Sequence, residues 1–248
     1  MPVTQAVILA AGVGSRLRPL TDDRPKAALA LAGRPLVGHA LSALATVGVA
    51  SVVVVAGHAR QALVAALDAA SGIDVTLVDN PAYATTNTLA SLLCAAPALR
   101  PGDFLLLDGD LVFEAAVLAA VDEPGTRLAV DAGRPLDDDA VKVALAGPRI
   151  VGIGKVLPSG ERPAAESIGI AKIDAATAPR LFAAGDTLLA ARHAEAYYEA
   201  AFQRLVTDGA RFDAADVTGL RWVEIDDRAD LRRAETMFAA VAPTSRQR

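Results

Sequence analysis

Short apolar runs alternate with amphipathic segments along the first half of the chain. The apolar runs are bounded by glycine, proline or polar residues, which is typical of strands buried in a parallel sheet. They predict strands at residues 6–11, 52–56, 75–78, 104–113 and 126–131. The segments between them predict helices at residues 36–46, 61–70 and 114–121, and another that begins after Thr86 or Asn87. This alternation predicts an α/β fold with a doubly wound, mostly parallel, Rossmann-like sheet that binds ligands at the carboxyl ends of its strands.

The pattern changes after residue 131, where shorter segments alternate between apolar and polar positions. These segments predict a small antiparallel lid made of strands at residues 141–145, 149–156 and 167–173. An amphipathic helix is expected at residues 193–207, followed by a strand that ends at Asp226 and a helix that continues to about residue 240.

The chain shows no linker, internal repeat or low-complexity segment, and its 248 residues suit one α/β domain with a substantial core. We expect this domain to cover residues 1–243. The change of pattern divides it into a half at residues 1–131 and a half at residues 132–243. Residues 244–248 are expected to form a loose tail.

Composition and charge narrow the classes of partner. A net charge of −5 argues against nucleic acid. Much of the 53% hydrophobic content is alanine, and the longest apolar run, residues 47–57, is too short to span a bilayer. The N-terminus lacks the basic region of a signal peptide, so we expect a cytoplasmic protein with no membrane partner. We interpret Cys94, which is the only cysteine, and His58 as structural residues.

A glycine-rich loop after the first strand indicates an anion site. Gly12 and Gly14 let the backbone approach a ligand closely, so that successive N–H groups can converge on a phosphate. Arg16 and Lys26 add full positive charge to the same loop. The dinucleotide fingerprint is excluded because Leu17 stands where its third glycine belongs, and the Walker A sequence Gly-Lys-Ser/Thr does not occur. The loop therefore belongs to another kind of phosphate site.

Two carboxylates separated by a glycine, Asp108 and Asp110, stand in the fourth apolar run. Carboxylates in such a setting are costly unless they are paired or bound to a cation. Mg²⁺ takes oxygen ligands and usually binds through one or two carboxylates plus substrate phosphates. The pair therefore predicts a magnesium site beside the phosphate loop. By contrast, we interpret the acidic run at residues 137–139 as a solvated loop.

The loop as a whole, Gly-x-Gly-x-Arg-x-x-Pro-x-Thr-x-x-x-Pro-Lys at residues 12–26, resembles the signature of nucleotidyltransferases. These enzymes join a nucleoside triphosphate to a sugar phosphate or a small alcohol phosphate. The resemblance implies the nucleotidyltransferase type of Rossmann-like fold. It also implies that Arg16 holds the triphosphate and that Lys26 offsets the charge that builds on the attacked phosphorus. The nucleotide-binding backbone positions that it implies are Ala10, Ala11, Gly12 and Gly14.

A second segment favours CTP as the nucleotide. Residues 80–92 resemble the Asn-x-x-Tyr-x-x-x-Asn-x-x-x-Ser-Leu segment of cytidylyltransferases that activate phosphocholine, related phospho-alcohols or phosphonates. They differ from the Gln-x-x-Pro-x-Gly segment of thymidylyl- and uridylyl-transferring sugar enzymes. By this resemblance Asn87 and Ser91 bind the nucleotide, whereas the local pattern by itself makes Asn87 a helix cap.

The resemblance extends into the second half of the chain. Val-Lys-Val, Arg-Ile-x-x-Ile-x-Lys and Glu-x-Ile-Gly follow one another as in the acceptor-binding region of the same enzymes. Two tyrosines before a glutamate resemble their site for a cationic head group. Residues 222–231 resemble the Trp-x-Glu-Ile-Asp-x-x-x-Asp-Leu element, which carries a second magnesium ligand. The acceptor-binding residues implied are Lys142, Lys155, Glu166, Tyr197, Tyr198, Glu199 and Glu224, and the metal ligands are Asp110 and Asp226.

The implied reaction is Mg²⁺-dependent transfer of CMP from CTP to a small phospho-alcohol or phosphonate, with release of pyrophosphate. Phosphocholine, 2-aminoethylphosphonate and inositol phosphate all suit this skeleton, so the acceptor stays open. Residues 1–131 would form the nucleotide-binding half, and residues 132–243, with the antiparallel lid, the acceptor-binding half. Two alternatives also stay open: a sugar-1-phosphate uridylyl-, thymidylyl- or guanylyltransferase, and a nucleotide-binding regulatory module without turnover. The sequence does not decide whether the protein forms a homodimer.

Overall fold

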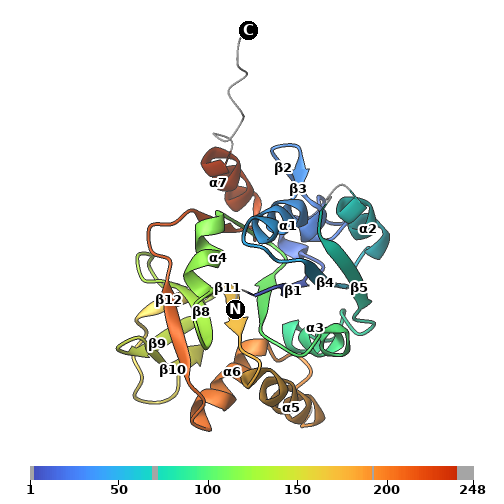
Figure 1. The fold of residues 1–248 in the computed structure, drawn as a ribbon. Coiled ribbons are helices and arrows are strands. Elements are labelled where there is room, and N and C mark those ends of the chain that lie inside the picture. Colours follow the sequence, from blue (N-terminus) through green and yellow to red (C-terminus); the bar gives the residue numbers. More distant parts are fainter. Residues whose placement is uncertain (1–2, 69–71, 192, 239–248) are drawn as a thin grey trace.

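The computed structural model describes residues 3–68, 72–191 and 193–238 of the chain (Figure 1). The strands in these residues are β1 (Gln5–Leu9), β2 (Ala30–Leu31), β3 (Arg34–Pro35), β4 (Ser51–Ala56), β5 (Asp74–Asp79), β6 (Phe104–Asp108), β7 (Leu111–Phe113), β8 (Thr126–Asp131), β9 (Lys142–Ala146), β10 (Arg149–Gly154), β11 (Ala165–Ile173), β12 (Phe212–Asp216) and β13 (Trp222–Glu224). The α-helices are α1 (Leu36–Thr46), α2 (Arg60–Asp68), α3 (Thr88–Ala95), α4 (Ala115–Val121), α5 (Thr177–Ala190), α6 (Tyr198–Thr207) and α7 (Arg228–Phe238). Short 3₁₀ helices lie at Ser15–Leu17, Lys26–Ala28 and Ala96–Ala98.

Nine of the strands form one mixed sheet, in the order β5-β4-β1-β6-β11-β8-β12-β10-β9. Strands β5, β4, β1 and β6 are parallel, so the chain crosses over between them by way of helices. Strand β11 runs antiparallel between β6 and β8, and β10 and β9 form a hairpin at the far edge (Figure 1). The antiparallel segments predicted as a lid are β9, β10 and β11, and they continue the main sheet.

Helices cover both faces of the sheet because the parallel strands are apolar on both sides. All of β1 is buried, with Ala6 and Ile8 in one core cluster and Val7 and Leu9 in the other. The first cluster includes residues of α1, α2 and α4, and the second includes residues of α3, α5 and α6. Burial on both faces explains why these strands appear in the sequence as unbroken apolar runs.

The prediction of one strand at residues 104–113 is wrong, because the chain turns at Gly109 and forms two strands. Strand β6 stays in the main sheet, whereas β7 leaves it and pairs antiparallel with β13. At the turn, the Gly109 N–H donates to the Leu9 carbonyl oxygen at 3.0 Å. A Cβ at Gly109 would lie 2.6 Å from that same oxygen, so only glycine fits this close to β1. Beyond β13, the Ile225 N–H donates to the Asp110 carbonyl oxygen at 3.0 Å, which brings the two carboxylate-bearing segments together.

The second half differs from the prediction in its helices. The sequence pattern does not predict α5, and α6 begins later than the predicted residue 193. The backbone before α6 is instead tied to α3, because the Leu89 N–H donates to the Ala196 carbonyl oxygen at 3.3 Å. Parts of the predicted second and last helices, at residues 69–70 and 239–240, lie outside the described residues, as does the predicted tail. No described helix is long and apolar enough to cross a bilayer.

Replacement of Gly109 by alanine tests the close contact between the turn and β1. The added methyl group would also lie 3.0 Å from the Ala10 Cα atom, so the backbone must shift. We expect Gly109→Ala to lower the free energy of unfolding, measured by urea denaturation, by about 1–3 kcal/mol, as overpacking usually does.

Gly12→Ala is the matched control, because a Cβ at Gly12 would meet no atom within 4 Å. It should change the free energy of unfolding by less than about 0.5 kcal/mol. Equal losses of stability in the two variants would contradict the close approach of Gly109 to β1.

Candidate functional site

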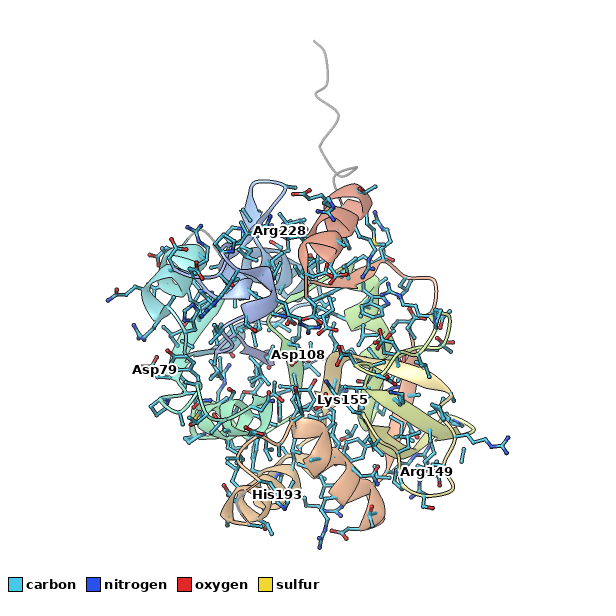
Figure 2. The ribbon with its side chains drawn as sticks, turned by 180° about the vertical axis from the view of Figure 1, so that it is seen from behind. Asp79, Asp108, Arg149, Lys155, His193 and Arg228 are labelled. Atoms are coloured by element: carbon cyan, nitrogen blue, oxygen red, sulfur yellow. The ribbon has the colours of Figure 1, made fainter. Side chains whose placement is uncertain are left out.

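A cleft of about 1100 Å³ opens at the carboxyl ends of the parallel strands. The glycine-rich loop, the end of β6, the loop after β8, β11, β13 and the start of α6 line it. Figure 2 labels two of its lining residues, Asp108 and Lys155, near the middle of the molecule. Most residues predicted from the sequence line this cleft, namely Ala10, Gly12, Gly14, Arg16, Lys26, Asn87, Asp110, Lys155, Glu166, Tyr197, Glu199, Glu224 and Asp226.

Contacts within and beyond the glycine-rich loop fix its shape. Gly14 has a φ of +66°, and a side chain there would collide with the side chain of Lys26. The Thr21 hydroxyl donates to the Gly14 carbonyl oxygen at 2.8 Å. The Nε2 atom of His58 lies 2.8 Å from the Thr21 carbonyl oxygen, which confirms the structural role predicted for His58. These contacts hold the loop backbone beside Lys26.

Lys26 joins two carboxylates that lie far from it in the sequence. Its Nζ atom is 2.6 Å from Asp110 Oδ2 and 2.7 Å from Asp226 Oδ1. Arg16 adds a contact of 2.9 Å between its Nη2 atom and Asp226 Oδ2. Burial disfavours the charge of Lys26, but the two carboxylates outweigh burial and raise the pKa of the ammonium group above its usual value. Lys26 therefore stays protonated at neutral pH.

Asp110, Glu224 and Asp226 form a cluster that fits a divalent cation. One carboxylate oxygen of each lies within 4.8 Å of the other two. Asp110 Oδ1 is buried and has no hydrogen-bond partner among the described residues. A set of carboxylate oxygens suits Mg²⁺. The resemblance assigns Glu224 to the acceptor, but its carboxylate lies in this cluster. Desolvation, and then the charges of Asp110 and Asp226, raise the pKa of Glu224 to about 8.

The cleft also contains two carboxylates with unpaired oxygen atoms. Asp108 Oδ2 accepts a hydrogen bond from the Tyr198 hydroxyl at 3.0 Å. Within the described part of the chain, Asp108 Oδ1 and Glu199 Oε2 are buried without a partner. Burial, and then the charge of Glu199, raise the pKa of Asp108 well above its usual value, and burial raises the pKa of Glu199 to about 7. A cationic ligand would offset the cost of keeping these two buried carboxylates ionised.

The two tyrosines predicted to bind the acceptor have different surroundings. Tyr197 lines the cleft, and the Nζ atom of Lys155 lies 5.2 Å from its ring centroid. Tyr198 is only 2% exposed, and its ring packs against Phe202 with 5.2 Å between the centroids. Tyr198 is therefore placed beneath the cleft, where its hydroxyl orients Asp108.

A smaller cavity of about 70 Å³ beside the glycine-rich loop holds two predicted residues that the main cleft does not. Ala11 and Ser91 line it together with Asn87. The Ser91 hydroxyl accepts a hydrogen bond from Asn80 Nδ2 at 3.0 Å. Asn87 acts as the N-cap of α3, because its side-chain oxygen accepts from the Thr88 N–H at 2.9 Å. The cap therefore holds Asn87 at the junction of the two cavities.

Lys142 lies outside the cleft, whereas Asp139, in the acidic loop that is exposed as predicted, lies at its border. Lys142 does not line the cleft, since its Nζ atom donates to the carbonyl oxygens of Ala140 and Lys155 at 3.4 and 3.3 Å. The predicted solvated loop at residues 137–139 borders the cleft. Asp139 lies 3.6 Å from Arg16 Nη1 and 3.5 Å from Lys155 Nζ. It thus connects a cation of the glycine-rich loop with one of the antiparallel strands.

Arg134 is a second lining residue that the sequence reasoning missed. Both Arg134 and Asp139 follow β8, which ends at the same edge of the sheet as β6. The rule that ligands bind at the carboxyl ends of strands could therefore have identified this loop.

The chain resembles known proteins over nearly its whole length. Residues 6–146 match the family model of the MobA-like NTP transferase domain. The chain is similar to the CMP-5'-(3-aminopropyl)phosphonate synthase of Streptomyces rubellomurinus, with 36% identity over 98% of this chain and 40% of that protein. It is also similar to the 2-aminoethylphosphonate cytidylyltransferase of Lancefieldella rimae, with 33% identity over 44% of each. The aligned part of the chain thus covers about two fifths of the length of each of these curated relatives.

A solved structure shares the fold. The inositol-1-phosphate CTP transferase from T. maritima superposes with a TM-score of 0.81, over 96% of both chains and at 24% sequence identity. Likeness at this level of identity shows the fold alone. It confirms the predicted Rossmann-like α/β fold of the nucleotidyltransferase type.

Glu199→Gln tests how much stability the protein loses when the buried Glu199 carboxyl group ionises. Folding raises the pKa of Glu199 from 4.5 to about 7. At a pH between these two values, Glu199 is therefore protonated in the folded protein and ionised in the unfolded chain. The contribution of Glu199 to stability therefore falls as the pH rises through this range. Glutamine cannot ionise, so the variant should gain about 2–3 kcal/mol of unfolding free energy relative to the unsubstituted protein between about pH 5 and about pH 8. Urea denaturation at each pH in metal-free buffer measures this gain.

Glu195→Gln is the control, because Glu195 is exposed and outside the cleft. It should show no pH-dependent gain. A stability difference between Glu199→Gln and the unsubstituted protein that is the same at every pH would contradict the raised pKa.

Proposed function

Because the chain belongs to the MobA-like NTP transferase domain family, we propose that it is a Mg²⁺-dependent cytidylyltransferase. It transfers CMP from CTP to a small phosphonate or phospho-alcohol acceptor and releases pyrophosphate. The observation that carries this proposal is the cluster of Asp110, Glu224 and Asp226 around Lys26. This cluster lies in the same cleft as the glycine-rich loop, so a triphosphate and a metal can meet there.

The nucleotide binds against the first half of the chain, residues 1–131. Ala10 and residues 12–14 line the cleft, and their backbone supplies N–H groups to the phosphates. Asn87 and Ser91, in the small cavity beside this loop, bind the base. The segment that carries them, together with relatives whose names include CMP and cytidylyltransferase, supports CTP over other nucleotides.

The acceptor binds against the second half, residues 132–243, and carries a positive charge besides its anionic group. Ten aspartate and glutamate side chains line the cleft, against five arginine and lysine side chains. Asp108 and Glu199, whose buried oxygens lack partners among the described residues, line the cleft together with Tyr197, which stands two residues before Glu199. Their carboxylates and the Tyr197 ring provide partners for an ammonium group. An aminoalkylphosphonate of the kind named in the two curated relatives satisfies both requirements.

The reaction is a direct displacement at the α-phosphorus of CTP. An oxygen of the acceptor phosphonate forms a bond to this phosphorus, and the bond to the bridging oxygen breaks, so that its electron pair leaves with pyrophosphate. Arg16 holds the triphosphate, and Lys26 stabilises the negative charge on the reacting phosphoryl group. Bound Mg²⁺, held by Asp110, Glu224 and Asp226, would neutralise phosphate oxygens. No covalent enzyme intermediate is required.

A crossed substrate screen tests the proposed activity. Pyrophosphate release is measured with Mg²⁺ for CTP, UTP, dTTP, ATP and GTP, each against 3-aminopropylphosphonate, 2-aminoethylphosphonate, phosphocholine, inositol-1-phosphate and glucose-1-phosphate. We expect release with CTP and an aminoalkylphosphonate because the base segment favours CTP and the unpaired carboxylates favour an amine. Release with UTP or dTTP and glucose-1-phosphate would instead support a sugar-phosphate enzyme.

Asp110→Asn and Asp226→Asn test the metal assignment. Each variant removes a negative charge from the cluster, so we expect kcat to fall by roughly a thousandfold, corresponding to several kcal/mol of lost stabilisation. Asp208→Asn is the control, because Asp208 forms an exposed pair with Arg204 on α6. Circular dichroism checks that all variants are folded. Near-normal turnover in either cluster variant would refute its role as a metal ligand.

A further inference from the structure

Arg134 lies in the loop after β8 and lines the cleft, but neither the sequence motifs nor the proposed reaction gives it a role. Three contacts fix its side chain. The guanidinium carbon lies 3.7 Å from the centroid of the Trp222 ring, and Nη2 donates to the Trp222 carbonyl oxygen at 2.8 Å. Its Nε atom lies 3.4 Å from Asp131 Oδ2. Stacking and the fork of donors therefore hold the guanidinium plane in one orientation.

Asp131 is itself held in place by two stronger contacts. It is 4% exposed, and its Oδ2 atom accepts a hydrogen bond from the Trp222 indole N–H at 2.8 Å. Its Oδ1 atom accepts from the Gly133 N–H at 2.8 Å. Both oxygens therefore have shorter partners than Arg134, whose Nε atom lies 3.4 Å from Oδ2.

Arg134 retains unused donors. Within residues 3–68, 72–191 and 193–238, its Nη1 atom has no hydrogen-bond acceptor, and Asp131 is the only carboxylate within 4.0 Å. Burial lowers the pKa of Arg134, so its surroundings disfavour the cation unless an anion compensates it. A ligand with several negatively charged oxygens would supply the missing acceptors.

The position of Trp222 connects Arg134 with the carboxylate cluster. Trp222 and Glu224 are two residues apart on β13, so their side chains point to the same face of this strand. The guanidinium stacked on Trp222 therefore lies on the face that also presents Glu224 to the cleft.

The acceptor side of the cleft also lacks one of its two expected cations. Lys142 is directed to backbone carbonyl groups and does not line the cleft, which leaves Lys155 from the antiparallel strands. A phosphonate dianion is held best by more than one cation, and a guanidinium can bind it through two parallel N–H groups.

We propose that Arg134 binds the phosphonate or phosphate group of the acceptor, and that Trp222 and Asp131 are its positioning residues. This assignment rests on the proposed function for the identity of the ligand. In this assignment Arg134 makes a rigid, bidentate contact with the acceptor in place of the contact expected from Lys142. The class of ligand recognised is a tetrahedral oxyanion that is not part of the nucleotide.

Steady-state kinetics with CTP and 2-aminoethylphosphonate or 3-aminopropylphosphonate test this assignment. Arg134→Gln should raise the KM for the acceptor by about tenfold or more, since a charged bidentate contact is lost. The KM for CTP should stay within about twofold, because that ligand is held elsewhere. Arg134→Lys should recover only part of the loss, since lysine restores the charge without the fork. Asp131→Asn should give an intermediate rise in the same KM.

Arg221→Gln is the matched control, because Arg221 precedes Trp222 but pairs with Glu114 outside the cleft. It should leave both KM values unchanged, and thermal denaturation checks that every variant is folded. A rise in the KM for CTP with an unchanged KM for the acceptor would overturn the assignment and move Arg134 to the triphosphate.

Calorimetric titration of the Mg²⁺-loaded protein with methylphosphonate separates this inference from the proposed function. We expect the unsubstituted protein and Arg221→Gln to bind methylphosphonate, and Arg134→Gln to bind it about tenfold more weakly. If this pattern appears but no nucleotide and acceptor give turnover, the Arg134 site stands and the proposed function fails. Equal binding by Arg134→Gln, or no binding by the unsubstituted protein, would overturn the Arg134 site.

Discussion

Charge compensation around Lys26 is the constraint on which the cleft depends. Lys26, Asp110 and Asp226 come from three distant parts of the chain, and each would be costly to bury without the others. Their meeting requires the turn at Gly109 and the pairing of β7 with β13. Those two features carry Asp110 out of the main sheet and set it against the segment that leads to Asp226. The fold thus assembles one cation between two anions before any ligand binds.

Ion pairs within the protein occupy most of the cations in the cleft. Arg16 contacts Asp226 and Asp139, and Lys155 also contacts Asp139. Phosphate groups that bind here must therefore exchange with carboxylates or bring cations of their own. For this reason a cleft rich in carboxylates would suit the metal-dependent transfer between two anionic substrates that we propose. Asp139 contacts both a cation of the glycine-rich loop and a cation that follows β10, so its exchange would affect both.

The fold alone does not choose the substrates, because one fold supports different chemistries through the residues placed in its site. The solved inositol-1-phosphate enzyme shares the fold over nearly the whole chain at 24% identity. In the proposed function, the choice of acceptor would depend on side chains such as Glu199 and Asp108, whose buried oxygens lack partners within the described chain. Their burial makes an anionic occupant unfavourable beside them and a hydrogen-bond donor, above all an ammonium group, favourable.

The sequence by itself determined the parallel half of the sheet, and it singled out the glycine-rich loop and four residues, Arg16, Lys26, Asp110 and Asp226, that the structure brings together. Apolar runs, glycine spacing and a long ungapped motif are local properties, so they can be recognised without the fold. Only the tertiary structure decided which neighbouring side chains face the cleft. Tyr197 lines it and Tyr198 does not, because contacts between α3 and the segment before α6 set where that helix begins.

The other differences between the sequence prediction and the structure also arise from contacts between distant segments. The break between β6 and β7 depends on how closely Gly109 approaches β1, about a hundred residues earlier in the chain. Glu224 joins the carboxylate cluster because β13 pairs with β7, and Arg134 is oriented by a tryptophan far along the chain. Residue types and their spacing predict which chemistry is available. The direction of each side chain depends on packing between distant segments, and no local pattern contains that information.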